Sequence, residues 1–257
     1  MAFQIVIVPY LSDNYAYIAH DLASGATAVI DVPEPGPILR ELAARDWKAS
    51  HILLTHHHSD HIDGVEALAA ATGAFVIGAA ADAHRLPPLD LAVAPGDVVR
   101  IGMQQGQVID VPGHTIGHIA YFFPEARALF TGDSLMVMGC GRLFEGTPAQ
   151  MWDTLGRLMA LPDSTRVFSG HEYAATNARF ALTVEPGNAV LKTRAESIDH
   201  VRAAGGFTVP ATLAEERATN PFLRAALPEM KSALGMQDAS DLAVFTELRS
   251  RRNGFRG

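Results

Sequence analysis

The residues with the clearest chemical potential lie in the run Thr55-His56-His57-His58-Ser59-Asp60-His61, and five of the eleven histidines fall between His51 and His61. Imidazole and carboxylate groups are ligands for zinc, iron or manganese, and no thiolate lies near enough to indicate a structural zinc finger. Residues 56 and 58 project to the same side of an extended segment, whose side chains alternate with a period of two. Asp60 and His61 then turn toward a neighbouring position. One short segment is therefore predicted to supply ligands to two metals.

Three further ligand-type residues follow apolar runs, in Gly113-His114, Gly132-Asp133 and Gly170-His171. In each pair the glycine relieves backbone crowding next to the candidate ligand. The carboxyl ends of strands are where α/β architectures keep their sites. Together with the run from His56 to His61, ligand-type residues therefore follow four predicted strands, and this pattern predicts one metal centre. The alternative is a solvated histidine-rich loop that binds metal adventitiously.

Other candidates for chemistry are assigned structural roles. His57 points away from its two neighbours if the segment is extended, so we expect it to bind no metal. His118 is expected to support the site or to lie in the core. Cys140, in Gly139-Cys140-Gly141, has no evident base beside it and is expected to be structural rather than nucleophilic.

Strands and helices alternate as far as about residue 170. Short apolar or β-branched runs predict strands at 3–9, 15–20, 27–31, 51–55, 74–78, 107–111, 120–123, 128–131 and 166–169. Helical patterns cover 37–44, 63–72 and 148–161, with Gly73 as a C-cap and Thr147 and Gln150 as a capping box. The mixture of hairpin and crossover spacings predicts an α/β fold with two sheets.

The chain changes character after His171. Helices are predicted at 172–183, 189–204, 213–218, 221–226, 229–234 and 241–249, with no comparable strand. We therefore expect a catalytic domain over residues 1–173 and a small all-helical domain over 174–257.

Composition restricts the class of partner. The 257 residues include 20 Lys and Arg against 28 Asp and Glu, a net charge of −8 that gives no overall attraction to nucleic acid or an anionic membrane. The N-terminus has no signal-peptide pattern, and no apolar run reaches the roughly 18 residues of a membrane helix. A single cysteine fits a reducing compartment. We expect a monomeric cytoplasmic protein with no membrane and no nucleic-acid partner.

The pattern H-x-H-x-D-H, followed by single His, Asp and His residues at strand ends, resembles the metallo-β-lactamase superfamily. The resemblance implies a four-layer αββα sandwich with a binuclear site. It assigns His56, His58 and His114 to the first metal, Asp60, His61 and His171 to the second, and Asp133 to a bridge between them.

Several longer stretches resemble the glyoxalase II (hydroxyacylglutathione hydrolase) family. They are 111–119, 139–146, 170–173, 184–188, 208–216 and 220–224, and the last two lie in the predicted helical domain. The resemblance implies hydrolysis of S-D-lactoylglutathione to D-lactate and glutathione, the second step of methylglyoxal detoxification. It also implies two divalent metals, zinc in the first place with iron or manganese also accommodated, and catalysis by Asp60 and Asp133 with a hydroxide shared between the metals.

A cluster of arginines at the C-terminus suits the anionic substrate. Arg249 and Arg252 share a helix face if the last helix continues, and a guanidinium pair fits the glycine carboxylate of glutathione. The resemblance adds Arg142, Phe144 and Tyr173 as glutathione contacts. Phe144 occupies a position where some members of the glyoxalase II family have tyrosine. Arg252 replaces the usual lysine, and Asn253 the usual acid.

Other classes share parts of this pattern. A glutathione persulfide dioxygenase with one iron is the main alternative, and the helical C-terminal segment with its two arginines argues against it. A flavin-linked diiron oxidoreductase would have glutamate in place of His58, and the commonest β-lactamases would have cysteine in place of Asp133. A nuclease would need a basic groove, and a non-catalytic metal scaffold would give no reason for the arginines.

Overall fold

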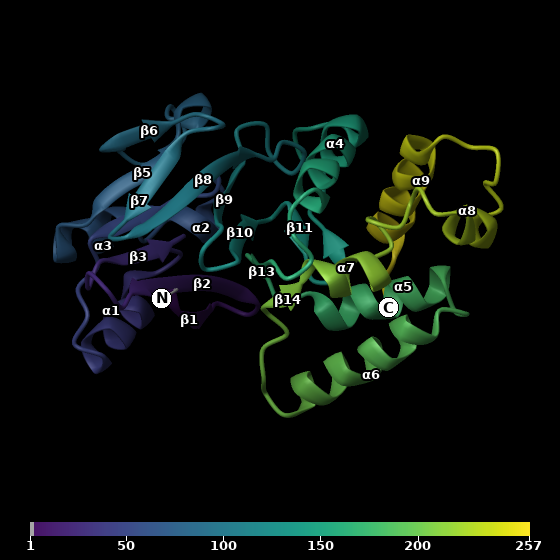
Figure 1. The fold of residues 1–257 in the computed structure, drawn as a ribbon, viewed down its shortest axis with the longest axis horizontal. Helices are drawn as coiled ribbons and strands as arrows, with labels where there is room; N and C mark the ends of the chain where they lie inside the picture. Colours follow the sequence, from purple (N-terminus) through teal and green to yellow (C-terminus); the bar gives the residue numbers. More distant parts are fainter. Residues whose placement is uncertain (1–2) are drawn as a thin grey trace. The chain divides into compact units, whose positions relative to one another are not determined.

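The computed structural model describes residues 3–257, which form two compact units. Unit 1 comprises the chain up to Val111 and Gly117–Gly132, and unit 2 comprises Pro112–Ile116 and Asp133–Gly257. Unit 2 therefore takes one short segment, Pro112–Ile116, from within the sequence of unit 1. Figure 1 labels the helices and strands of the chain.

Unit 1 contains a mixed sheet of six strands in sequential order. Its first three strands are antiparallel and the next three are parallel, as the hairpin and crossover spacings require. The strands are β1 (Phe3–Tyr10), β2 (Asn14–Asp21), β3 (Thr27–Ile30), β4 (His51–Leu53), β5 (Phe75–Ala79) and β6 (Leu91–Val93).

Helices pack on this sheet and complete its apolar core. Helix α1 (Pro35–Ala44) buries Ile38 and Leu42, and α3 (Val65–Thr72) buries Val65 and Leu68, in one cluster with side chains of β1 to β5. The apolar residues recur at three- and four-residue intervals, so one stripe of each helix faces the sheet. The short α2 (Ser59–Ile62) and the 3₁₀ helix η1 (Ala80–Asp82) follow the ends of β4 and β5.

An antiparallel meander forms the second sheet of unit 1, with β7 (Val98–Ile101), β8 (Gln104–Asp110), β9 (Ile119–Phe123) and β10 (Ala128–Gly132). Aromatic rings from the two sheets meet: Phe3 lies 4.8 Å from Phe123 and Tyr17 lies 5.6 Å from Phe130, measured between ring centroids. The Tyr121 hydroxyl donates to the Leu54 carbonyl over 2.9 Å. The two sheets therefore pack face to face, with helices on the outer side of the first.

Unit 2 is mostly helical. Its helices are α4 (Pro148–Met159), α5 (Ala174–Val184), α6 (Ala189–Ala203), α7 (Leu213–Thr219), α8 (Pro228–Leu234) and α9 (Asp241–Gly254). Its strands are β11 (Leu135–Met136), β12 (Gly139–Cys140), β13 (Arg166–Ser169) and β14 (Ala211–Thr212). The rings of Phe180, Phe222 and Phe245 form a chain through its core, with centroids 6.2 and 5.9 Å apart.

The predicted helix ends are confirmed where a specific cap is present. Gly73 ends α3 with a φ of 71°, and Thr147 and Gln150 form both hydrogen bonds of the capping box at α4. Helix α9 continues to Gly254, so Arg249 and Arg252 do lie one turn apart on a single helix.

Several local predictions are wrong. Residues 221–226 form consecutive turns instead of a helix, because Asn220 accepts from the Phe222 amide and Leu223 and Arg224 bond three residues back. The C-terminal region also contains a strand, β14, which pairs with β13. The short strands β6, β7, β11 and β12 went unpredicted, because two- to four-residue runs carry too little alternation to register as strands.

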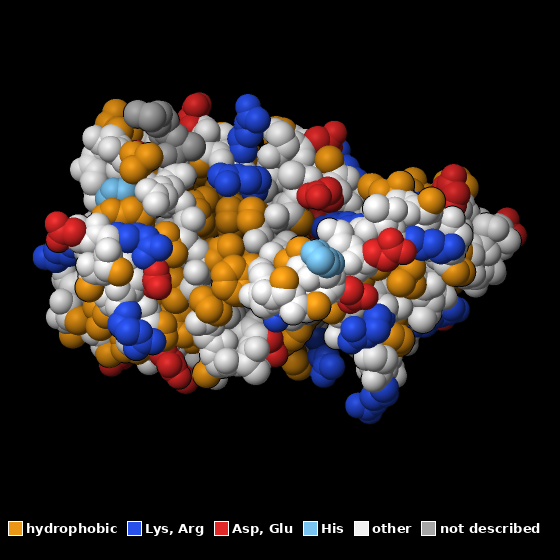
Figure 2. Space-filling view, turned by 90° about the horizontal axis from the view of Figure 1, so that it is seen from below, with side chains coloured by type: hydrophobic (Ala, Val, Ile, Leu, Met, Phe, Trp, Pro, Cys, Tyr) orange, Lys and Arg blue, Asp and Glu red, His pale blue; other side chains and the backbone are white. Residues whose placement is uncertain are grey.

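No helix among residues 3–257 is long and apolar enough to cross a membrane. On the face drawn in Figure 2, acidic and basic side chains are intermixed, and neither sign gathers over a large area.

Candidate metal centre

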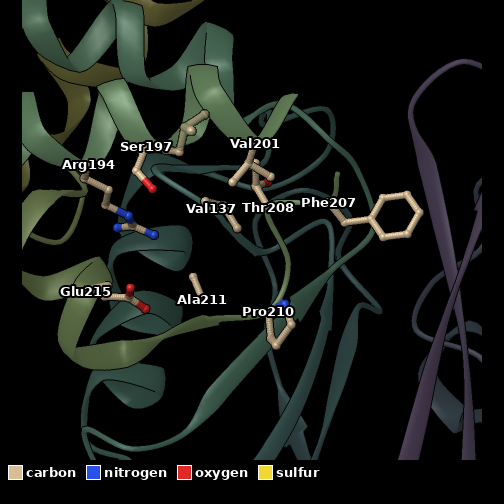
Figure 3. Close-up of a pocket in the computed structure, with 10 residues that line it drawn as sticks. Val137, Arg194, Ser197, Val201, Phe207, Thr208, Pro210, Ala211 and Glu215 are labelled. Carbon is tan, nitrogen blue, oxygen red and sulfur yellow. The ribbon is translucent and has the colours of Figure 1, made fainter. Parts of the chain in front are cut away.

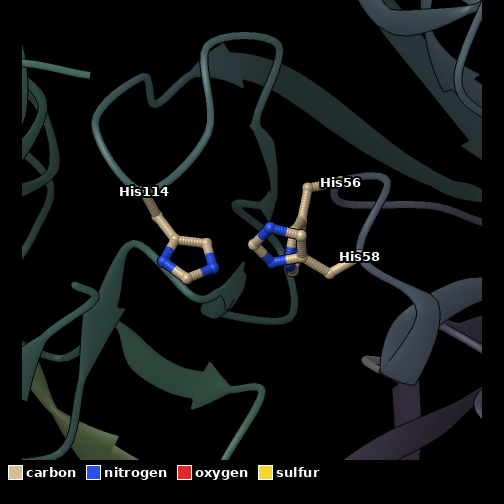
Figure 4. A group of neighbouring side chains, drawn as sticks. All are labelled: His56, His58 and His114. Atoms are coloured by element: carbon tan, nitrogen blue, oxygen red, sulfur yellow. The ribbon is translucent and has the colours of Figure 1, made fainter. Parts of the chain in front are cut away.

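The histidine-rich run begins where β4 ends. Within unit 1, His56 and His61 are buried and His58 and Asp60 are partly buried. His56 Nε2 lies 3.1 Å from His58 Nδ1, and the His56 and His61 ring centroids are 4.2 Å apart. Figure 4 shows His56 and His58 on this loop, and His114 on the loop that follows β8. The extended backbone therefore does project residues 56 and 58 to one side, as predicted.

A buried carboxylate at the end of β3 orients His61. Asp31 Oδ2 accepts a hydrogen bond from His61 Nδ1 over 2.9 Å and from the Thr55 hydroxyl over 2.8 Å, while Oδ1 accepts from the Thr55 amide over 2.9 Å. Asp31, His56 and His61 offer ligand atoms within 4.8 Å of one another. Since both oxygens of Asp31 already accept hydrogen bonds, we interpret Asp31 as the group that fixes the His61 tautomer, which directs Nε2 toward a metal.

Asp60 and His56 are also held by neighbours in unit 1. Asn14 Nδ2 donates to Asp60 Oδ2 over 2.9 Å. The ring of His118, fully buried, stacks on His56 with centroids 4.6 Å apart and an interplanar angle of 11°. His118 is thus a supporting residue, as the sequence suggested.

The remaining three predicted ligands gather in unit 2. One carboxylate oxygen, Asp133 Oδ2, lies 3.3 Å from His114 Nε2 and 3.2 Å from His171 Nε2. All three side chains are buried. A single oxygen that faces two imidazoles from different loops has the geometry that a bridging ligand needs.

Backbone features fix these ligands. His114 Nδ1 donates to the Arg142 carbonyl over 2.7 Å, so the other ring nitrogen, Nε2, is the one directed at Asp133. Gly113, with a φ of 145°, lies against Met151, and Gly132, with a φ of 48°, lies against Thr55. Both positions would clash with a Cβ atom, which confirms the crowding inferred for these two glycines.

Three guanidinium groups lie close together in unit 2. Burial lowers the pKa of Arg252, and the positive charges of Arg249 and Arg142 lower it further. Among residues 3–257, none of the three forms an ion pair with a carboxylate. An uncompensated positive cluster of this kind favours an anionic ligand.

The two predicted carboxylate-binding arginines are held differently. Arg249 is only 6% exposed; it donates to the Cys140 carbonyl over 2.8 Å and to Asn253 Oδ1 over 3.2 Å. Arg252 donates through Nε and Nη2 to Asn177 Oδ1, each over 3.1 Å. Asn177 therefore fixes the direction of Arg252, and Asn253 contributes a positioning contact where an acid would have formed an ion pair.

Two exposed aromatic side chains contact candidate metal ligands of unit 2. The Tyr173 ring stacks on His171 at 4.8 Å, and the Phe144 ring meets His114 edge-on at 5.3 Å. Phe144 is 61% exposed, and the Arg142 guanidinium lies 5.9 Å from its ring centroid. A large apolar side chain that remains exposed beside candidate ligands is available to contact a substrate.

A separate hollow of about 130 Å³ lies in unit 2, between α6, α7 and residues 207–211. Arg194, Ser197 and Glu215 face it together with apolar side chains (Figure 3). None of the residues predicted for the metal centre or for glutathione binding lines this hollow.

Three supporting residues, Asp31, Asn14 and Asn177, were not predicted from the sequence. Asp31 had a usable signal, because it ends a predicted strand as the other site residues do. Asn14 and Asn177 follow no ligand pattern, since their contacts arise from parts of the chain that are distant in sequence. The chemistry of the donor set, neutral imidazoles and carboxylates without thiolate, fits divalent metals.

Comparison with known proteins places this geometry in a family. Residues 14–171 match the metallo-β-lactamase superfamily, and residues 172–255 match the C-terminus of hydroxyacylglutathione hydrolase. A protein from Cereibacter sphaeroides named hydroxyacylglutathione hydrolase is 60% identical over 99% of this chain and 100% of its own length.

Solved structures agree at the level of the fold. The structure of ETHE1 from Myxococcus xanthus has a TM-score of 0.65 and 28% identity, and covers 98% of each chain. That of TTHA1623 in a di-iron-bound form has a TM-score of 0.61 and 28% identity, and covers 86% of this chain and 100% of that one.

The mixed sheets flanked by helices and the clustered His and Asp residues are those of a metallo-β-lactamase fold, which confirms the expected fold class and fits a binuclear metal site. A C-terminal helical region distinguishes one branch of this superfamily. The chain belongs to the hydroxyacylglutathione hydrolase family.

Proposed function

We propose that the chain hydrolyses S-D-lactoylglutathione, a 2-hydroxyacyl thioester of glutathione, to D-lactate and glutathione. The observation that carries this proposal is the 60% identity, along essentially the whole chain, to a relative named hydroxyacylglutathione hydrolase. The match to the C-terminus of that family supports the same reaction over the dioxygenase alternative, because it covers the segment that holds Arg249 and Arg252.

Two divalent metals would be held by the seven predicted ligands. His56, His58 and His114 would hold the first metal, Asp60, His61 and His171 would hold the second, and Asp133 would be shared by both, an assignment supported by the contacts of Asp133 Oδ2 with His114 and His171. When bound, such a metal pair lowers the pKa of water and polarises a carbonyl group. Zinc is the first candidate, and the ligand set also accommodates iron or manganese.

The chain's own residues supply orientation. Asp60, held by Asn14, would orient the attacking water toward the thioester carbonyl. Asp31 and the Arg142 carbonyl keep His61 and His114 in the tautomers that a metal needs. The departing thiolate is a good leaving group, so the reaction asks for little acid assistance from the protein.

Glutathione would bind to unit 2 through charge and stacking. The glycine carboxylate would pair with Arg252 and Arg249, and Arg142, Tyr173 and Phe144 would contact the rest of the tripeptide. The guanidinium cluster supports this placement, since an anion would offset the mutual repulsion of Arg252, Arg249 and Arg142. Without a hydroxyl, Phe144 offers ring contact in place of a hydrogen bond.

We further propose that residues 174–257 act as the glutathione-binding domain, as the sequence predicts. The match of residues 172–255 to a separate family region supports this division. A monomer in the cytoplasm remains our expectation, and the single free cysteine is consistent with a reducing compartment.

The test is loss of thioester absorbance from S-D-lactoylglutathione, with the lactoyl thioester of N-acetylcysteamine as the matched substrate that lacks the tripeptide. We expect rapid hydrolysis of the first and much slower hydrolysis of the second. No hydrolysis by metal-loaded protein would refute the proposal. Oxygen uptake with glutathione persulfide, in the absence of thioester cleavage, would support the dioxygenase instead.

A further inference from the structure

A second carboxylate–imidazole pair lies beside the metal loop and involves none of the predicted ligands. Asp82, at the end of η1, is 2% exposed, and its Oδ2 accepts from His57 Nδ1 over 3.1 Å. Its other oxygen, Oδ1, accepts from Arg85 Nη2 over 2.6 Å and from Arg85 Nε over 3.1 Å. The ion pair with Arg85 keeps the buried carboxylate compensated while it holds the imidazole.

His57 lies within the metal loop, residues 56–61. It stands between His56 and His58 in the sequence, and its ring is bonded through Nδ1 to Asp82. The rings of His57 and His58 are 5.0 Å apart, at an interplanar angle of 62°. A hydrogen bond that holds the His57 ring therefore restrains the backbone between His56 and His58 and the His58 ring beside it.

Asp82 also lies against the loop that carries His118. A Cβ atom at Gly117 would be 2.3 Å from Asp82 Cγ, so only glycine allows this approach. The next residue, His118, stacks on the His56 ring. Asp82 thus contacts both segments that border His56, one by a hydrogen bond and the other by close packing.

We propose that Asp82 is a positioning residue for the metal loop, acting through His57 and Gly117 to hold His56 and His58 at the angle that metal binding requires. This inference rests on the proposed metal centre. It assigns a role to His57, which the sequence predicts to bind no metal, and to an aspartate 25 positions away.

The experiment is a double-mutant cycle on metal affinity, measured as the zinc dissociation constant by competition with a chelator. Asp82→Ala and His57→Ala should each weaken zinc binding by about 10-fold, the lower end of the range for groups bonded directly to a ligand, because neither residue bonds to a ligand itself. The double variant should be no weaker than Asp82→Ala, because Asp82→Ala already removes the contact through which His57 acts. In Asp82→Asn the amide oxygen can still accept from His57 while the amide nitrogen faces the Arg85 donors, so the zinc affinity should lie between those of the wild type and Asp82→Ala.

Asp21→Ala is the matched control, because Asp21 is also a fully buried carboxylate of unit 1, bonded to Ser24 and the Met103 amide, away from the metal loop. It should lower thermal stability without changing zinc affinity. Equal affinity losses in Asp82→Ala and Asp21→Ala, or additive losses in the cycle, would overturn the inference. If Asp82→Ala does not fold, wild-type affinity in His57→Ala would overturn it equally. A wild-type protein that binds no zinc would instead refute the proposed function.

Discussion

Asp31 fixes the orientation of the His61 imidazole. Its carboxylate accepts from His61 Nδ1 and is itself held by the backbone amide and the hydroxyl of Thr55. Asp31 adopts a φ of 57°, a left-handed conformation that asparagine and aspartate tolerate better than most residues. The same carboxylate therefore links the end of β3 to the loop after β4.

For this reason Asp31→Asn should fold but bind metal more weakly. The neutral amide is a poorer acceptor for His61 and offers a donor where Thr55 already donates. We expect the zinc affinity to fall by about 10- to 100-fold while the metal-free protein keeps its circular dichroism spectrum. Unchanged metal content after dialysis against a chelator would show that Asp31 does not orient His61.

Cys140 is close to the arginine cluster yet buried. Burial raises the pKa of its thiol, and the nearby Arg249 only partly offsets that effect. Less thiolate is therefore present at a given pH in the folded protein than in the unfolded chain. Iodoacetamide at pH 8 should alkylate Cys140 slowly in the native protein and rapidly in guanidinium chloride. Equal rates in the two conditions would contradict a structural role.

At the scale of elements, α9 presents the candidate carboxylate-binding groups. Arg252 lies half-buried on the face that meets Asn177 of α5, whereas the neighbouring Arg251 is exposed and pairs with Glu247. The two adjacent arginines therefore provide a test and its control on one helix.

We expect Arg252→Ala to raise KM for S-D-lactoylglutathione by about 10- to 100-fold, the value of one charge-assisted contact, with a smaller change in kcat. The contact lies far from the thioester, so it contributes mainly to binding. Arg251→Ala should leave both constants unchanged. An unaltered KM for Arg252→Ala would remove this residue from the glutathione site.

Helix α4 depends on its cap. The Thr147 hydroxyl oxygen accepts from the backbone N–H of Gln150, and the Gln150 side-chain oxygen Oε1 accepts from the backbone N–H of Thr147. Two backbone N–H groups that the helix leaves unsatisfied are therefore paired. Thr147→Ala should lower the free energy of unfolding by about 1 kcal/mol, measured by urea denaturation, whereas Thr147→Ser should retain most of it. If Thr147→Ser lowered the free energy of unfolding as much as Thr147→Ala, the stabilisation would come from packing of the threonine methyl group and not from the cap.

At the scale of the whole molecule, the features that could be predicted from the sequence are those that depend on local residue patterns. The strand ends that carry His56, Asp133 and His171 follow from apolar runs and glycine signals, and the fold class follows from their order. The turns at 221–226 were not predicted, since the Asn220 side chain overrides a helical composition there. The partners of the ligands were also missed: Asp82 meets His57, and Asn177 meets Arg252, only after the chain has folded.

The proposed function requires two metals, held by the seven predicted ligands, that are needed together for thioester hydrolysis. The direct measurement is a zinc titration of metal-free protein, in which bound metal and the rate of S-D-lactoylglutathione hydrolysis are followed in the same samples. We predict tight binding of two equivalents per chain, with full activity only at the second, and loss of both in Asp133→Ala. Full activity at one equivalent, or in Asp133→Ala, would contradict the claim.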